Sequence, residues 1–69
     1  MKEIKLNRDF ITLGQLLKLT GIAETGADAK QIILSGIIKV NGQIILQRGK
    51  KLYKGDKVSI NDEDEFIIV

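Results

Sequence analysis

The hydrophobic pattern changes its period at Gly36, and this change constrains the fold more than any other feature of the sequence. Before Gly36, apolar residues recur at helical spacing in two segments, near residues 12–20 and 25–35. After it, the period shortens to two residues, as in half-buried strands. The sequence therefore predicts an α+β domain in which two packed helices lie against a small antiparallel sheet.

Each predicted helix carries its own start and stop signals. Thr12 stands three residues before Gln15, which is the spacing of a capping box, and Gly21 follows as a C-terminal glycine. Thr25 begins the second helix as an N-cap, and Gly36 ends it. The side chains expected on the buried faces, with Ile33 at the centre of the core, are Leu13, Leu16, Leu17, Ala29, Ile32 and Ile33.

The strongest strand signal is a hairpin. Residues 37–40 and 43–46 flank the dipeptide Asn41-Gly42, which is typical of a type I′ turn. One further short strand is expected in the basic segment that follows the hairpin. The remaining strands are expected over residues 2–6, 57–60 and 66–69, with turns at Gly55-Asp56 and over residues 61–65.

The absence of cysteine and histidine limits the chemistry of the chain. Without these residues there are no disulfides and no common zinc site, and the thiolate and histidine-dependent routes to catalysis are excluded. Ser35, Thr25 and Tyr53 remain as candidate nucleophiles, but none has an evident activating base. We therefore expect a binding module and not an enzyme, with no cofactor and no metal.

Length and composition predict one domain spanning residues 1–69. A hydrophobic content of 43% with 29% charged residues is typical of globular proteins and not of disordered ones. No apolar run approaches the roughly 18 residues of a membrane helix, and the first ten residues are too charged for a signal peptide. We expect a soluble, cytoplasmic monomer.

Positive charge gathers in one segment of the chain. All 11 Lys and Arg residues lie within residues 1–61, whereas four of the nine acids lie together at 62–65. Residues 48–57 alone contain Arg48, Lys50, Lys51, Lys54 and Lys57. Such a cluster fits either a phosphate-binding surface or a solvated loop that keeps a small protein soluble.

From Thr12 to Ile60 the chain resembles the S4 RNA-binding domain, also called the αL motif. The resemblance is carried by Thr25, Ala29, Ile32, Ile33, Gly36, Ile38, Lys39, Val40, Asn41, Gly42, Gly55 and Asp56. It implies RNA binding on the surface formed by the second helix and the following hairpin. The chain looks like a small stand-alone bacterial member of that family.

The chain departs from the family's usual motif at the start of both helices. The family commonly has arginine and aspartate where this chain has Thr12 and Gly14, and it often has arginine where this chain has Gly26. Two positions that usually contact phosphate in the family are therefore lost. Lys30 lies one turn further along the second helix, and Lys39 and Arg48 lie in the sheet region, so basic character is moved and not abolished.

The sequence supports two functional hypotheses. The first is a module that binds the phosphates of structured ribosomal or transfer RNA, with Tyr53 either stacking on a base or packing against its neighbours. The second is a protein–protein adaptor that keeps the fold without the RNA site, because Leu34, Ile37, Ile44 and Ile45 exceed the needs of a small core. The candidate RNA contacts are Thr25, Gly26, Lys30, Lys39, Arg48, Lys50 and Lys51.

Overall fold

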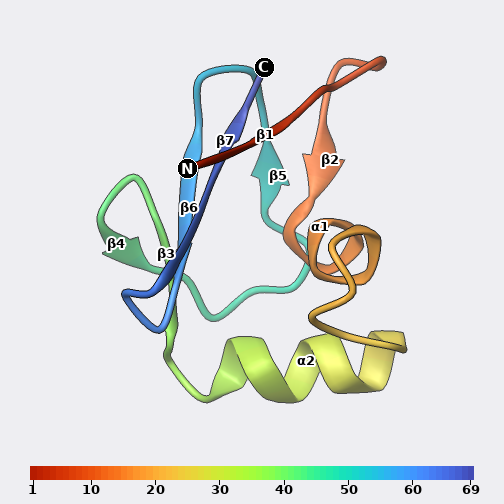
Figure 1. Ribbon diagram of the computed structural model, residues 1–69. Helices are drawn as coiled ribbons and strands as arrows, with labels where there is room; N and C mark the ends of the chain where they lie inside the picture. The colour runs from red at the N-terminus through yellow and green to blue at the C-terminus, as the bar shows by residue number, and fades with distance from the viewer.

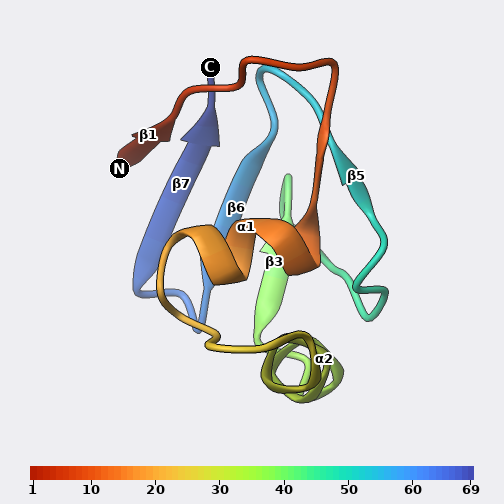
Figure 2. The same ribbon diagram turned by 90° about the vertical axis from the view of Figure 1, so that its right-hand side faces the viewer.

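The computed structural model describes residues 1–69 and places helix α1 across one face of a sheet, with helix α2 beside it at the lower end of the strands (Figures 1 and 2). Neither helix is long and apolar enough to cross a membrane. The elements in chain order are β1 (Lys2–Ile4), β2 (Ile11–Thr12), α1 (Leu13–Leu19), α2 (Gly26–Leu34), β3 (Ile38–Val40), β4 (Gln43–Ile44), β5 (Lys51–Leu52), β6 (Lys57–Ile60) and β7 (Asp64–Ile68).

The sheet is mixed, which corrects the prediction of a purely antiparallel one. Its five strands run in the order β1-β7-β6-β3-β4, and every pair is antiparallel except β1 with β7. Parallel neighbours need a long connection, and here the rest of the domain separates the first strand from the last. Strands β2 and β5 form a separate antiparallel pair beside the start of α1 (Figure 2).

The predicted helix signals are confirmed in detail. Gln15 donates its backbone N–H to the Thr12 hydroxyl at 3.3 Å, and its side-chain oxygen accepts the Thr12 N–H at 3.0 Å. The Thr25 hydroxyl accepts the Asp28 N–H at 3.1 Å at the start of α2. Gly21 and Gly36 follow the two helices with φ values of +80° and +81°, which favour glycine.

The two predicted turns are present, and they are bonded to each other. Asn41 and Gly42 have φ values of +52° and +85°, as a type I′ turn requires. The Asn41 side-chain nitrogen donates to Asp56 Oδ1 at 3.0 Å, and the Asn41 oxygen accepts the Lys57 N–H at 3.0 Å. The other Asp56 oxygen accepts the Tyr53 N–H at 2.8 Å. Side chains from two distant turns thus fix the end of the sheet.

The closing hairpin differs from its prediction. Strand β7 begins at Asp64 and not at residue 66, because Ile60 and Asp64 are paired across a tighter turn. Asn61 and Asp62 make that turn with φ values of +54° and +56°. β4 ends at Ile44, and β1 is shorter than the strand expected over residues 2–6.

The core is entirely apolar and draws on both helices and all three central strands. Ile33 is fully buried, which confirms its predicted central place, whereas Ile32 is only partly buried. The expected apolar faces of both helices point inward. The fifteen core residues are Leu6, Ile11, Leu13, Leu16, Leu17, Ala23, Ala29, Ile33, Ile38, Val40, Leu52, Val58, Ile60, Phe66 and Ile68.

Candidate nucleic-acid interface

The basic loop between β4 and β5 is attached to the start of α1 by backbone hydrogen bonds. The Arg48 carbonyl accepts the Gly14 N–H at 2.9 Å, and the Lys50 carbonyl accepts the Leu13 N–H at 2.8 Å. These bonds occupy N–H groups that a helix start otherwise leaves unpaired. The backbone of the loop is therefore held against the first turn of α1, and the side chains of the loop lie beside that turn.

Two glycines leave a path for the Arg48 side chain. A Cβ atom added at Gly14 would lie 3.0 Å from Arg48 Cγ and 3.4 Å from its carbonyl oxygen. A Cβ added at Gly26 would lie 3.7 Å from Arg48 Nη1. The arginine side chain therefore passes over Gly14 and brings its guanidinium group to the first residue of α2.

A polar hollow of about 230 Å³ surrounds this arginine, and we call it the Arg48 hollow. It contains two cationic side chains, no acidic one and no hydrophobic residue. The N–H groups of Gly26 and Ala27 have no hydrogen-bond partner at the start of α2. The residues that line the hollow are Thr12, Gly14, Gln15, Lys18, Gly26, Arg48 and Gly49. Such a set of donors can bind anionic oxygens.

Four of the predicted contacts lie at or beside α2. Gly26 and Arg48 line the hollow directly. Thr25 is adjacent as the N-cap, with its hydroxyl engaged by the Asp28 N–H. Lys30 is exposed one helical turn beyond Gly26, and residues four apart lie on the same side of a helix.

Lys50 and Lys51 extend the cationic surface along β5. Both side chains are exposed. The Lys51 ammonium lies 4.7 Å from the centre of the Phe10 ring, within the range of a cation–π interaction. Tyr53 is 49% exposed, and its ring centre lies 6.1 Å from that of Phe10 with the planes tilted by 50°. The tyrosine therefore combines aromatic packing with an accessible surface.

Lys39 lies apart from these residues. Its neighbours Ile38 and Val40 are buried, so alternation along β3 directs Lys39 to the outer face of the sheet. There its ammonium forms the one ion pair in the structure, 3.2 Å from Asp62, which offsets its charge. The hollow beside it is also lined by Glu65 and not by Arg48. RNA contact by Lys39 stays a prediction, on a different surface from the others.

Lys18 and Gly14 are members of the hollow that the sequence analysis missed. The available signal was the helical spacing, because Gly14 and Lys18 are four residues apart on α1. Gln15 lies between them on the face opposite the buried leucines. Only the contact with Arg48 could have shown that this face matters.

The apolar residues behind the adaptor hypothesis are partly accessible. Leu34 and Ile44 are both 56% exposed, and Ile37 is 36% exposed. Ile45 is partly buried against the core. These residues come from the end of α2, the segment after it and β4, and none of them lines a hollow.

The fold and this hollow define a small α+β domain that presents a cationic surface beside its two helix starts. The chain belongs to the S4 domain family, which it matches over residues 4–69. It is 38% identical over 66 residues to a Bacillus subtilis (strain 168) protein described as a probable ribosome maturation protein, RlbA, in a match that covers 96% of this chain and 93% of that one. The predicted resemblance is thereby confirmed, and it supports an RNA-associated role.

A solved structure shares the fold. The 30S ribosomal protein S4e from Thermoplasma acidophilum superposes with a TM-score of 0.56 at 23% identity. The match covers 80% of this chain and 28% of that protein, so this chain is similar to a part of it. The mixed α+β architecture is therefore shared with a ribosomal protein.

Proposed function

We propose that this chain is a non-catalytic RNA-binding module that contacts the phosphates of structured RNA. The observation that carries the proposal is the Arg48 hollow, where the side chains of Arg48 and Lys18 meet the start of α2 at Gly26, without an acidic side chain. The contact surface comprises the start of α2, the exposed face of α1 and the basic loop. It acts as a single cytoplasmic domain without a cofactor.

Charge balance favours a polyanionic partner on this side of the molecule. Lys39 is the only cation paired with a carboxylate, so Arg48, Lys18, Lys50 and Lys51 are free to bind other anions. The nearest acid on α2, Asp28, lies in its first turn, where its N–H is bonded to Thr25. A cluster of exposed cations that have no carboxylate partner within the protein is typical of a phosphate-binding surface.

Ribosomal RNA is the favoured partner among structured RNAs. The Bacillus subtilis relative is described as a ribosome maturation protein, and the match covers nearly all of both chains. Paired RNA is recognised largely through its backbone and 2′-hydroxyl groups, which suits lysine and arginine more than an aromatic platform. The composition of the surface agrees with this mode, since Phe10 and Tyr53 are its only aromatic residues.

The test is the salt dependence of RNA affinity. Each neutralised phosphate contributes a slope of roughly −0.7 to −0.9 in log affinity against log salt. The variant Lys50→Ala/Lys51→Ala is expected to reduce that slope by about one to two units for different RNAs alike, because phosphate contacts carry no sequence information. Titration of a ribosomal RNA hairpin at several salt concentrations, followed by fluorescence anisotropy, measures it.

The matched control is Lys2→Ala/Lys57→Ala. It removes the same charge from two exposed positions on β1 and β6, away from the hollow. If both variants lost RNA affinity and salt slope equally, the effect would come from net charge and not from a contact made by Lys50 and Lys51. An unchanged slope in the Lys50 and Lys51 variant would remove this loop from the site.

The adaptor hypothesis is supported by the exposure of Leu34 and Ile44. It requires a protein partner on the end of α2 and on β4, away from the Arg48 hollow. Absence of RNA binding by the wild type at low salt would favour this second function. Binding that depends on Arg48 would favour the first.

A further inference from the structure

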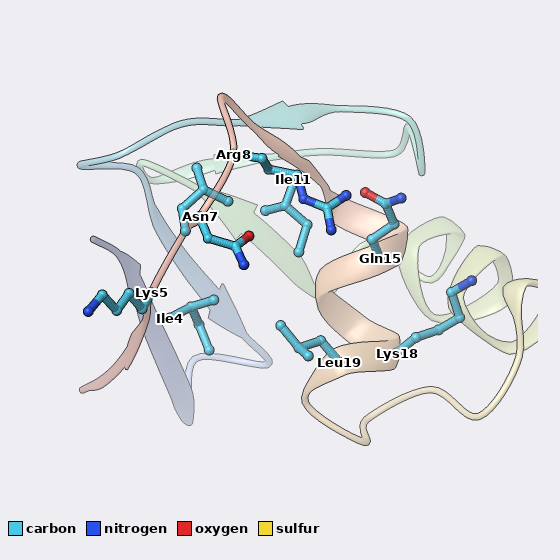
Figure 3. Close-up of a pocket in the computed structure, with 9 residues that line it drawn as sticks. Ile4, Lys5, Asn7, Arg8, Ile11, Gln15, Lys18 and Leu19 are labelled. Carbon is cyan, nitrogen blue, oxygen red and sulfur yellow. The ribbon is translucent and has the colours of Figure 1, made fainter.

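A second and larger hollow lies between the N-terminal segment and α1 (Figure 3). We call it the N-terminal groove. Its volume of about 630 Å³ falls within the range of small-ligand sites. In Figure 3 the side chains of Ile4, Ile11 and Leu19 converge on it from β1, β2 and the end of α1.

The apolar wall of the groove includes an exposed leucine. Leu19 is the last residue of α1 and is 65% exposed, so most of its surface is available to a ligand. Ile11, by contrast, is buried and belongs to the core, which gives the wall a fixed backing. The face of a nucleobase is flat and can be buried against such a wall.

Polar groups stand over the apolar wall. The Asn7 amide points between Ile4 and Leu19, and the Arg8 side chain extends over Ile11 toward Gln15 (Figure 3). The Asn7 amide offers a donor and an acceptor, as the edge of a base requires, and the Gln15 amide offers its N–H groups, because its oxygen already accepts the Thr12 N–H. Lys5 points away from the groove.

The charged residues that line the groove are all positive. Arg8 and Lys18 line it, and no acidic residue does. Two carboxylates are adjacent in sequence to lining residues, Glu3 and Asp9; Asp9 lines a neighbouring hollow that shares Arg8 and Gln15 with the groove. An apolar wall, amide groups and a cationic rim together match a nucleotide, which has an apolar face, a hydrogen-bonding edge and a phosphate.

The two hollows are neighbours. Gln15 and Lys18 line both of them, so a strand whose phosphate lies at Arg48 has only these two side chains to pass on its way to the groove. We propose that the N-terminal groove receives one unpaired nucleotide of the RNA bound at the Arg48 hollow, which deepens the proposed function and rests on it. The nucleotide is unpaired because a base within a helix has its faces stacked and its Watson–Crick edge paired, so neither can enter such a site.

The experiment compares two RNA hairpins that differ by one bulged nucleotide in the stem. Affinities are measured by fluorescence anisotropy at one fixed salt concentration. The wild type is expected to bind the bulged hairpin about fivefold to tenfold more tightly, from the apolar surface that one base buries. Leu19→Ser is expected to abolish this preference and to leave the affinity for the fully paired hairpin unchanged.

The matched control is Leu34→Ser. Leu34 is the last residue of α2 and is 56% exposed, so the change is chemically the same at an equivalent place outside the groove. This variant is expected to keep the full preference for the bulged RNA. Circular dichroism of both variants checks that the fold is intact.

The outcomes separate the two proposals. Equal binding of both hairpins by the wild type overturns the nucleotide subsite and leaves the phosphate-binding function standing. A loss of affinity for both hairpins in Leu19→Ser also overturns it, because Leu19 then serves docking in general. Failure of the wild type to bind either hairpin at low salt overturns the phosphate-binding function and the subsite together.

Discussion

Replacement of Gly14 by alanine tests whether Arg48 can lie over α1 only because Gly14 has no side chain. Gly14 is the second residue of α1, where alanine fits the backbone and favours the helix by up to about 1 kcal/mol. The added Cβ would lie 3.0 Å from Arg48 Cγ, closer than ordinary van der Waals contact. Since the Arg48 side chain is exposed, it is the group that moves.

The expected result is a loss of RNA affinity with little change in stability. Displacement of Arg48 removes about one phosphate contact, so the salt slope falls by roughly 0.7–0.9. One charge-assisted hydrogen bond at an accessible site corresponds to a loss of about threefold to tenfold in affinity. The free energy of unfolding changes by less than about 1 kcal/mol, because the gain in helix propensity offsets the tighter contact.

The assay is titration of one structured RNA at several salt concentrations, with urea unfolding in parallel. Gly49→Ala is the matched control, because it lies in the same hollow and its added Cβ meets no atom within 4 Å. The double variant Gly14→Ala/Arg48→Ala is expected to bind no more weakly than Arg48→Ala alone. Wild-type affinity and slope in Gly14→Ala, together with a clear loss in Arg48→Ala, would refute the reasoning.

Two further predictions concern stability. Ile33→Ala is expected to lower the free energy of unfolding by about 2–5 kcal/mol, because the side chain is fully buried in the core; a loss below about 1 kcal/mol in urea unfolding would contradict its central place. Asn41→Ala is expected to cost about 1–2 kcal/mol more than Asn61→Ala, since both residues have positive φ but only the Asn41 side chain is hydrogen-bonded, to Asp56 and Lys57. Equal costs in thermal or urea unfolding would show that backbone conformation alone matters at Asn41.

Local signals in the sequence were sufficient to predict the helices and the main hairpin. The capping box at Thr12 and the glycine at Gly36 act within a few residues, so their effect can be predicted without the tertiary fold. The turn at Asn41 is equally local, because its positive φ is a property of the dipeptide. Its bond to Asp56 is not local, and it was not predicted.

The sheet and the site depend on contacts between distant segments. Strands β2 and β5 have two residues each, too few to show alternation, yet their pairing of Thr12 with Lys51 brings the basic loop to α1. The parallel partner of β1 likewise follows from the complete sheet and not from its own sequence. Alternation with Ile38 and Val40 predicts that Lys39 points away from the core, but only the fold shows that this outer face is not the one that carries Arg48.

The departures from the family motif become related once the chain is folded. Thr12, Gly14 and Gly26 are the positions that lack the family's usual arginines and aspartate, and all three line the Arg48 hollow. A side chain at Gly14 would displace Arg48, and one at Gly26 would lie against its guanidinium. The arginine supplied by the loop therefore occupies space that is open because Gly14 has no side chain. The loss of two cations at Thr12 and Gly26 is thus accompanied by the loss of an acid at Gly14, which gives Arg48 room to bring positive charge back to the helix starts.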